Sequence, residues 1–500
     1  VIFDQSASRK SVVVNDVLPV AHMLFDAVDD YQLGGAGLIS GPGGLTKRGA
    51  NTLTIASREH TFLGTTRIEG GTVRIESLDF SGQPSSLGSS TEPIALTNSI
   101  LEIASKGATD RSLVLEGNVT LEIPASSYTV LNGSISGSGQ LIKKGSGQVT
   151  LGASNTYSGN TTLQAGTILL GTREANIFGL GNSANPADNP GRGSLRFEGG
   201  TLRMFEINTT SYTGPSYWNV EVPEGATARW EVPSRWRMAG MLTGKGNLTI
   251  MIPYVRSDFE GNWSGFEGTI SLVHDGDGDG GDFRVKNNYG YPQADFHLSA
   301  GTSLFSVNSG SSLSIGALAG APGSSLRGAN SAHTWVVGTR NTDAVFEGTI
   351  ADGGGALSII KRGTADWTLR GASTYSGSTQ ILEGRLIVNN TSGSATGTGP
   401  VQVGTQGILS GNGTISGAVS ISGTLEPGLS VGTIQFANQV QITATGRLIA
   451  EVSGSSTTTS DKVIAGGTFT ANGTLEIRRL SGNYAANDQF TLLQAEQIQG

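Results

Sequence analysis

The chain has 500 residues, of which 75 are glycine and 14% are charged, whereas average proteins have about 7% glycine and about 25% charged residues. Its apolar residues never gather into the run of roughly 18 that a membrane helix needs, so we expect no membrane insertion. The net charge of −8 argues against a nucleic-acid partner, because phosphate binding requires basic patches. The chain has no cysteine, which excludes thiolate catalysis and favours an exported bacterial protein over a secreted animal one.

Helix signals are almost missing from the sequence. Residues 20–28, VAHMLFDAV, could form a short helix, but they follow Pro19, and we expect a strand there. Elsewhere apolar and polar residues alternate, as in Leu53-Thr54-Ile55, and this period of two is typical of strands with one buried face. Glycine, asparagine and serine separate these short runs, as expected of turns. The sequence therefore predicts an all-β protein.

Three segments repeat one another. Residues 141–170, LIKKGSGQVTLGASNTYSGNTTLQAGTILL, align without a gap with residues 359–388, IIKRGTADWTLRGASTYSGSTQILEGRLIV. Residues 45–75, LTKRGANTLTIASREHTFLGTTRIEGGTVRI, align after one extra residue, and Phe62 then takes the place of the tyrosine. Repeated short strands that continue along most of the chain argue against a closed sandwich of seven or eight strands. They predict a parallel β-helix with Gly-rich turns, in which coils of about 20 residues stack in register.

The middle of the chain has a different composition. Residues 171–197 are rich in Gly, Asn and Pro, as in a linker, and residues 198–300 contain four of the six tryptophans. We therefore predict three parts. Residues 1–172 form an N-terminal β-helix with two repeats, residues 173–300 an inserted aromatic-rich β module, and residues 301–500 a C-terminal β-helix with the third repeat and a truncated end.

The repeat motif, K-x-G-x-x-x-x-T-L followed by T-Y-S-G-x-T and a further Gly, resembles the autotransporter-associated β-strand repeat, also called the passenger-associated transport repeat. Residues 409–434, 460–463 and 492–500 are similar to the C-terminal part of large surface proteins of Gram-negative bacteria, and residues 253–270 to a stretch of such proteins from the Bacteroidetes. The resemblance implies a right-handed parallel β-helix that outer-membrane secretion machinery exports, by the type V or the type IX route. It also implies that the repeat itself carries no catalytic residue.

The chain begins with Val1 and ends at Gly500, and no signal peptide, translocator barrel or sorting domain is recognisable in it. We therefore expect a mature product or a piece of a longer protein, and the export route stays open.

One motif suggests a metal. His274 is followed by DGDGDGGD, in which Asp275, Asp277 and Asp279 alternate with glycine as in the first half of a calcium loop. The twelfth position, where such a loop needs a bidentate glutamate, is Lys286. Calcium is thus the one candidate cofactor, and a solvated Asp-Gly turn is the alternative. The five histidines are scattered without metal-ligand spacing.

The tryptophans of the middle part suggest a second kind of site. Trp218, Trp236 and Trp263 are candidates for stacking on the sugar rings of an extended glycan. The alternative is that these rings fill the interior of the module, as large aromatic side chains usually do.

Catalysis has little support in the sequence. Polysaccharide lyases and glycoside hydrolases can be β-helices, and a hydrolase needs two carboxylates at a fixed separation. Asp277 and Asp279 with Arg284 or Lys286 could be assembled into a lyase site, but nothing in their spacing requires it. We expect no enzyme.

Basic pairs recur at one position of the repeat, as Lys47-Arg48, Lys143-Lys144 and Lys361-Arg362. We interpret them as solvated corners that discourage aggregation between edges.

The sequence thus predicts a non-catalytic passenger on the outer surface of a Gram-negative bacterium. It would act as a stalk or an adhesin that contacts a glycan or the surface of a host or neighbouring cell. The alternative is a carbohydrate-binding or polysaccharide-lyase-like β-helix.

Overall fold

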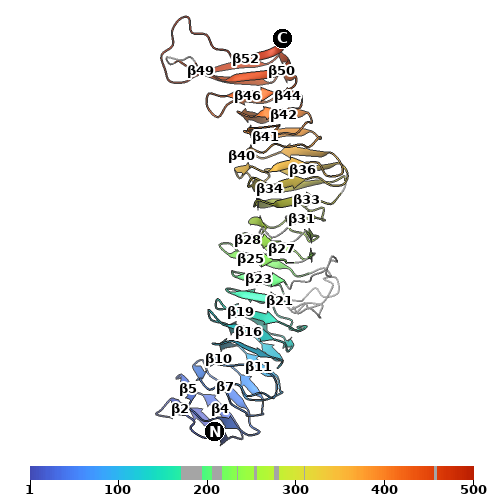
Figure 1. Cartoon of the computed structure of the whole chain (residues 1–500). Coiled ribbons are helices and arrows are strands. Elements are labelled where there is room, and N and C mark those ends of the chain that lie inside the picture. The colour runs from blue at the N-terminus through green and yellow to red at the C-terminus, as the bar shows by residue number, and fades with distance from the viewer. Residues whose placement is uncertain are drawn as a thin grey trace. The chain divides into compact units, whose positions relative to one another are not determined.

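The computed structural model describes residues 1–170, 194–204, 217–233, 235–252, 256–274, 281–308, 310–454 and 459–500. These residues form strands and turns, with no helix among them (Figure 1). Within this part of the chain, no helix is long and apolar enough to cross a membrane. The chain divides into two compact units, residues 1–251 and 252–500.

The first unit is a stack of coils whose strands form parallel sheets along its faces. The first sheet contains β1 (Ile2–Asp4), β4 (Met23–Asp26), β7 (Leu45–Arg48), β9 (Thr66–Ile68), β11 (Ile94–Thr97), β14 (Leu113–Glu116) and β17 (Ile135–Gly137). The second contains β2 (Ser11–Val13), β5 (Tyr31–Gly34), β8 (Thr52–Ile55), β10 (Gly71–Ile75), β12 (Ser99–Ile103), β15 (Asn118–Glu122), β18 (Gln140–Lys144), β20 (Thr161–Leu163), β22 (Leu195–Phe197), β24 (Val220–Val222) and β27 (Leu242–Gly244). On a third face lie β13 (Gly107–Thr109), β16 (Tyr128–Leu131), β19 (Gln148–Leu151), β21 (Thr167–Leu170), β23 (Thr201–Met204), β25 (Thr227–Glu231) and β28 (Asn247–Met251). Three short strands complete the unit, β3 (Leu18–Pro19), β6 (Ile39–Ser40) and β26 (Arg237–Met238).

The second unit is built in the same way, but several of its strands run across a corner. One face holds β29 (Arg256–Phe259), β31 (Gly281–Val285), β33 (Thr302–Ser306), β35 (Ser325–Arg327) and β38 (Thr349–Ala351). The other strands are β30 (Thr269–Val273), β32 (Tyr291–Leu298), β34 (Ser312–Gly320), β36 (His333–Val337), β37 (Ala344–Phe346), β39 (Leu357–Lys361), β40 (Asp366–Leu369), β41 (Thr379–Val388), β42 (Val401–Gly411), β43 (Thr414–Ile415), β44 (Val419–Ile421), β45 (Thr424–Pro427), β46 (Thr433–Phe436), β47 (Val440–Ile442), β48 (Arg447–Ser453), β49 (Thr459–Ser460), β50 (Lys462–Ala471), β51 (Thr474–Arg479) and β52 (Leu493–Gln499). The strands β41 and β42 pair with each other along their whole length, with a shift in register between Ile381 and Glu383. Each of them thus continues from one face of the coil to the next.

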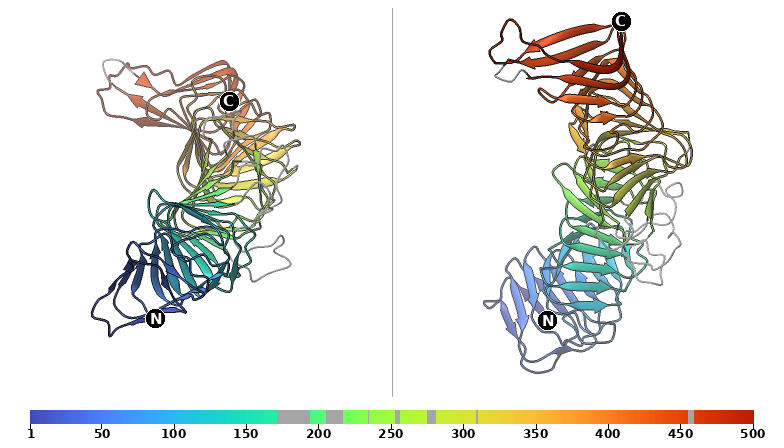
Figure 2. Two further views of the ribbon diagram at one scale, coloured as in Figure 1. Left: turned by 60° about the horizontal axis from the view of Figure 1, so that its bottom comes forward. Right: turned by 45° about the horizontal axis from the view of Figure 1, so that its top comes forward.

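Both units place like residues on top of one another. Leu53 is paired with Val73, and Leu101 with Leu121, so these coils take 20 residues each. The inward side chains of the alternating pattern are buried and form apolar ladders through the interior. Figure 2 shows the strands of successive coils lying parallel along each unit. The predicted parallel β-helix with coils of about 20 residues is therefore confirmed, and so is the strand in residues 20–28.

The strands of the predicted middle part that lie in the first unit continue the existing sheets. Thr161 of β20 is paired with Leu195 of β22, and Thr167 of β21 with Thr201 of β23. The borders predicted at residues 172 and 300 stay predictions, because a division by compactness does not test a change in composition.

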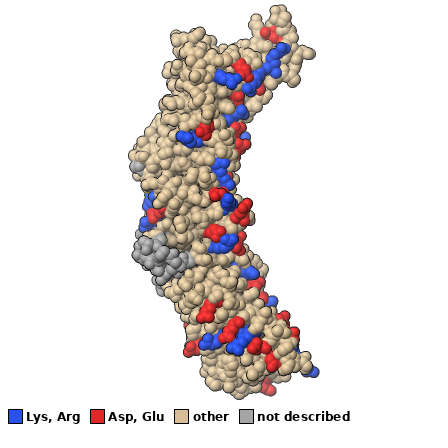
Figure 3. All heavy atoms as spheres, turned by 180° about the vertical axis from the view of Figure 1, so that it is seen from behind, with Lys and Arg blue, Asp and Glu red and all other residues tan. Residues whose placement is uncertain are grey.

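Charged residues on the outer faces form pairs between neighbouring coils. Arg74 lies 3.0 Å from Glu102, its partner in the register of β10 and β12. Arg203 of β23 meets Glu231 of β25 at 2.6 Å. Two like charges at stacked positions would repel each other, and a pair of opposite charges avoids this repulsion. Each exposed pair nevertheless contributes little stability. Figure 3 shows red and blue side chains side by side, with broad uncharged areas between them.

Candidate functional site

The three repeat copies share a buried lysine. Lys47, Lys143 and Lys361 have no more than 1% of their surface exposed. Each stands at an inward position of the alternating pattern, two residues after a buried Leu or Ile. Lys143 is paired with Leu121 in the preceding coil and Leu163 in the next, so it interrupts an apolar ladder.

Each of these ammonium groups binds the carbonyls of its own corner. The Nζ of Lys143 donates to the carbonyl oxygens of Lys144 at 2.6 Å and Gly145 at 2.7 Å, and to Ala165 of the next coil at 3.2 Å. The Nζ of Lys361 makes the corresponding three bonds, to Arg362, Gly363 and Glu383. The Nζ of Lys47 binds the carbonyls of Arg48 and Gly49. We call each of these arrangements a lysine clamp.

The glycine of the clamp explains why the motif reads K-x-G. Gly145 has a φ of 71°, and a Cβ there would lie 2.2 Å from the carbonyl oxygen of Ile123. Gly363 has the same φ, and its Cβ would lie 2.1 Å from the carbonyl oxygen of Gly338. The corner thus requires a residue without a side chain for two reasons, the left-handed backbone and the close approach of the preceding coil.

Burial lowers the pKa of each clamp lysine from 10.5 to about 8, because removing the ammonium from water disfavours its charged form. Nearby carboxylates partly oppose this shift, among them Glu122 for Lys143 and Asp366 for Lys361. The clamp lysines are buried, and each Nζ donates to backbone carbonyls of its own turn. We assign them a structural role.

This finding corrects our interpretation of the basic pairs as solvated corners. The second member of each pair, Arg48, Lys144 or Arg362, is exposed as expected, but the first is buried. The alternation itself contained the signal, since a lysine two residues after an inward leucine faces inward as well.

A second buried contact is shared by two of the three repeats. The hydroxyl of Tyr157 lies 2.6 Å from the Oγ1 of Thr161, and Tyr375 lies at the same distance from Thr379. Burial raises the pKa of both tyrosines. In the first repeat, Phe62 occupies the tyrosine position, and the buried Oγ1 of Thr66 has no hydrogen-bond partner there.

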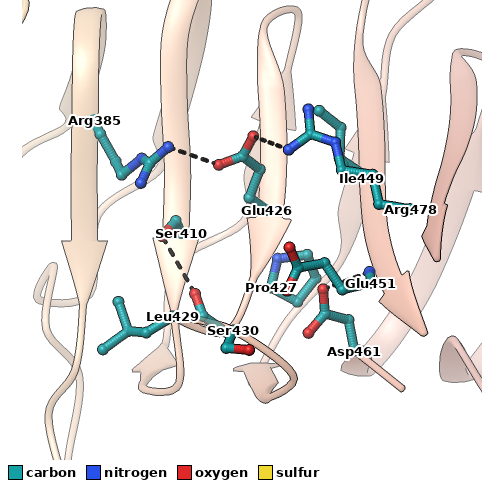
Figure 4. Close-up of a pocket in the computed structure, with 11 residues that line it drawn as sticks. Arg385, Ser410, Glu426, Pro427, Leu429, Ser430, Ile449, Glu451, Asp461 and Arg478 are labelled. Carbon is teal, nitrogen blue, oxygen red and sulfur yellow. Dashed lines mark hydrogen bonds and ion pairs between the residues drawn. The ribbon is translucent and has the colours of Figure 1, made fainter. Parts of the chain in front are cut away.

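The second unit contains a small polar pocket of about 180 Å³ beside β42, β45 and β48. Figure 4 shows Glu426 between Arg385 and Arg478, with which it forms ion pairs at 2.9 and 3.7 Å. Asp461 lies deeper, and its two carboxylate oxygens accept hydrogen bonds from the backbone N–H groups of Gly432 at 2.8 Å and Glu451 at 2.7 Å.

The chemistry of this pocket is that of a structural polar network. Burial raises the pKa of Asp461 to about 6, and the backbone hydrogen bonds limit this shift. Both oxygens of Asp461 are occupied, and Glu426 is held by two guanidinium groups. Among the described residues, no group of three His, Cys, Asp or Glu side chains is placed to hold a metal ion.

The residues singled out from the sequence lie in different surroundings. Trp218 and Trp263 are buried, with 3% and 1% of their surface exposed, and Trp236 is partly exposed. Trp263 packs against Phe259 and Tyr291 inside the second unit. The buried rings of Trp218 and Trp263 could stack on a sugar only if their coils opened, whereas Trp236 is partly exposed. Glycan binding by these three tryptophans stays a prediction. Asp275, Asp277 and Asp279 lie outside the described residues, and the calcium prediction remains untested.

Comparison with known proteins identifies the repeat. Residues 45–75, 141–170 and 359–388 match the model of the passenger-associated transport repeat. These are the three segments that align with one another in the sequence. We refer to them as transport repeats from here on.

A curated relative is similar to part of the chain. The adhesin BmaC autotransporter of Brucella suis biovar 1 (strain 1330) is 35% identical over 138 residues, which is 26% of this chain. The chain spans about 4% of the length of that relative.

The clamp can be tested by comparing two neighbouring lysines. We expect Lys143→Met to lower the free energy of unfolding by about 1–3 kcal/mol, because it leaves carbonyls of the corner without a donor. The matched control Lys144→Met removes the same charge from the exposed neighbour and should change the free energy by less than about 0.5 kcal/mol. Urea unfolding followed by circular dichroism measures both. Equal effects of the two substitutions would contradict the clamp.

The lowered pKa predicts a pH dependence with a definite sign. Between pH 8 and 10.5 the unfolded chain still binds the Lys143 proton while the folded chain has released it, so rising pH favours the folded state. The stability difference between the wild type and Lys143→Met should therefore grow as pH rises through this window, whereas Lys144→Met should follow the wild type. A difference that shrinks instead would mean that the folded clamp holds its proton more tightly than the unfolded chain does.

The unpaired Thr66 predicts a stabilising substitution. Phe62→Tyr should supply the hydroxyl that the other two repeats have and raise the free energy of unfolding by about 1 kcal/mol. In a chain that also carries Thr66→Val the gain should disappear, and a double-mutant cycle by urea unfolding measures this coupling. A gain of the same size without the Thr66 hydroxyl would show that the tyrosine acts through packing.

Proposed function

We propose that this chain is a non-catalytic part of a surface-displayed passenger, which acts as an adhesin or as the stalk of one. The observation that carries the proposal is the set of three transport repeats, each built around a buried lysine clamp. The similarity to a protein named as an autotransporter adhesin supports the same role. The proposed location is the outer surface of a Gram-negative bacterium, reached through outer-membrane secretion machinery. Origin in the Bacteroidetes and the type IX route belong to this proposal only as alternatives.

The polar pocket of the second unit offers no support for an enzyme. A hydrolytic pair needs one carboxyl that can give up a proton and one that is free to act as a base or nucleophile. Asp461 holds two backbone N–H groups, and Glu426 is held by Arg385 and Arg478. These contacts fix the last coils in place, and they would be lost if either side chain took part in a reaction.

The proposed role can be tested on whole cells. The chain is placed between an export signal and the outer-membrane barrel of a laboratory autotransporter, and antibody binding to intact cells measures its display. We expect the displayed chain to increase the attachment of cells to cultured epithelial monolayers above that of cells with the barrel alone. The double variant Lys143→Met/Lys361→Met should be displayed several-fold less, since losses of 1–2 kcal/mol change protein abundance by such factors.

Two results would contradict the proposal. One is a wild-type chain that antibodies do not detect on intact cells, and display without a gain in attachment would restrict the proposal to a stalk. The other is the release of new reducing ends or unsaturated products when the purified chain is incubated with plant, algal and bacterial polysaccharides.

A further inference from the structure

A groove crosses the outer face of the second unit, at some distance in sequence from the tryptophan-rich region. It has a volume of about 450 Å³ and lies over β42, β44, β47, β50 and β52. Its floor is formed by strands whose inward valines, Val401, Val419 and Val440, are buried in the core. The polar side chains that line it include Gln402, Ser420, Gln439, Gln441, Thr470 and Gln499.

In-register stacking arranges these side chains in a column. Each is paired with its counterpart in the next coil, Gln402 with Ser420, Ser420 with Gln441, Gln441 with Thr470, and Thr470 with Gln499. Neighbouring coils lie about 4.8 Å apart, and outward residues of one strand about 7 Å apart. Gln439 therefore stands beside Gln441 as part of a second column. One column of amides and hydroxyls thus runs across five strands, and beside it stand Gln439 and Thr468 together with Pro400 and Ala418.

The side chains that line the groove belong to few chemical classes. No Lys, Arg, Asp, Glu or aromatic residue lines the groove. Among the residues that the structure describes, none of the lining glutamine, serine or threonine side chains makes a hydrogen bond. Every amide therefore offers two donors and an acceptor to a ligand, and every hydroxyl offers both roles.

This chemistry excludes several classes of ligand. Nucleic acids and acidic polymers need basic groups, and protein partners are usually anchored by aromatic side chains or arginine. A neutral sugar polymer has hydroxyl groups along its whole length, and each hydroxyl both donates and accepts. Such a polymer matches a column of uncharged amides and hydroxyls that continues from strand to strand.

We propose that this groove binds a neutral, unbranched polysaccharide whose chain runs across β42, β44, β47, β50 and β52. The inference rests on the proposed adhesin function and names the class of ligand that the chain would hold at the cell surface. Hydrogen bonds between the side chains of the groove and the sugar hydroxyls hold the polysaccharide, and charged groups take no part in binding.

Affinity electrophoresis of the full chain tests this proposal. The protein is run through gels that contain glucomannan, mixed-linkage glucan or, as the acidic probe, polygalacturonate. We expect glucomannan or mixed-linkage glucan to retard the wild type, and polygalacturonate to leave it unretarded. A pull-down on insoluble glucomannan or mixed-linkage glucan compares binding of the wild type at low salt and at about 0.5 M NaCl. We expect binding to persist at high salt, because salt screens only charged interactions.

Two matched double variants locate the site. Gln402→Leu/Gln441→Leu removes two amides from the groove and should weaken binding by about tenfold or more. Gln406→Leu/Gln435→Leu removes two exposed amides of β42 and β46 outside the groove and should bind as the wild type does. Circular dichroism confirms that both variants are folded, since all four side chains are exposed.

Failure to bind either neutral polysaccharide overturns the proposal, as does equal binding by the two double variants or binding to polygalacturonate alone. Such a failure is distinct from failure of the adhesin role, because display and attachment of whole cells are measured separately, in an assay that contains no added polysaccharide.

Discussion

The structure depends on one constraint, the stacking of each coil in register on the coil before it. Every outward or inward position of a strand lies against the same position of the neighbouring strands. Each side chain must therefore be compatible with the side chains stacked directly above and below it. Apolar residues form continuous ladders such as Leu53, Val73 and Leu101. Opposite charges alternate on the outer faces, as at Arg74 and Glu102. The same rule produces the column of amides and hydroxyls in the groove of the second unit.

The corners are where this constraint is hardest to meet, because the backbone turns and its carbonyls no longer all point along the stack. A buried carbonyl without a donor costs free energy. The lysine clamp supplies donors at three such corners, but it buries an ammonium group, and this burial lowers the pKa of Lys143. Replacing a buried charged group by an apolar one is often neutral in other proteins. Here the carbonyls remain when the lysine is removed, so the clamp is expected to stabilise.

Much of the fold followed from the sequence alone. The period of two in the short runs, the glycines between them and the self-alignment of three segments led to a parallel β-helix with coils of about 20 residues. These signals are local, and stacking translates them directly into structure. The candidate sites followed much less well. Trp218 and Trp263 are conspicuous in the sequence, but large aromatic rings stabilise a narrow interior and these two are buried.

The clamp and the groove are formed by residues of different coils, so their contacts cannot be read from one segment of the sequence. Whether Lys143 faces inward could be read from its spacing to Leu141, but the carbonyls that it binds belong to its own corner and to the next coil. The amide column joins residues as far apart as Gln402 and Gln499, whose alignment depends on the length of every coil between them. A shift of one residue in the register of any of these strands would turn its outward side chains inward.

The buried lysines of the transport repeats are structural clamps, and at Lys143 and Lys361 they also join neighbouring coils. Hydrogen–deuterium exchange of the wild type and of Lys361→Met, followed by mass spectrometry of peptides, tests this claim most directly. In a stack where each coil contacts only its neighbours, the substitution should speed exchange in the coil of Lys361 and in the coils beside it, within β36, β39 and β41, and leave β8 and β10 unchanged. Unchanged protection of β36, β39 and β41 would contradict the claim, because the clamp would then hold nothing in place.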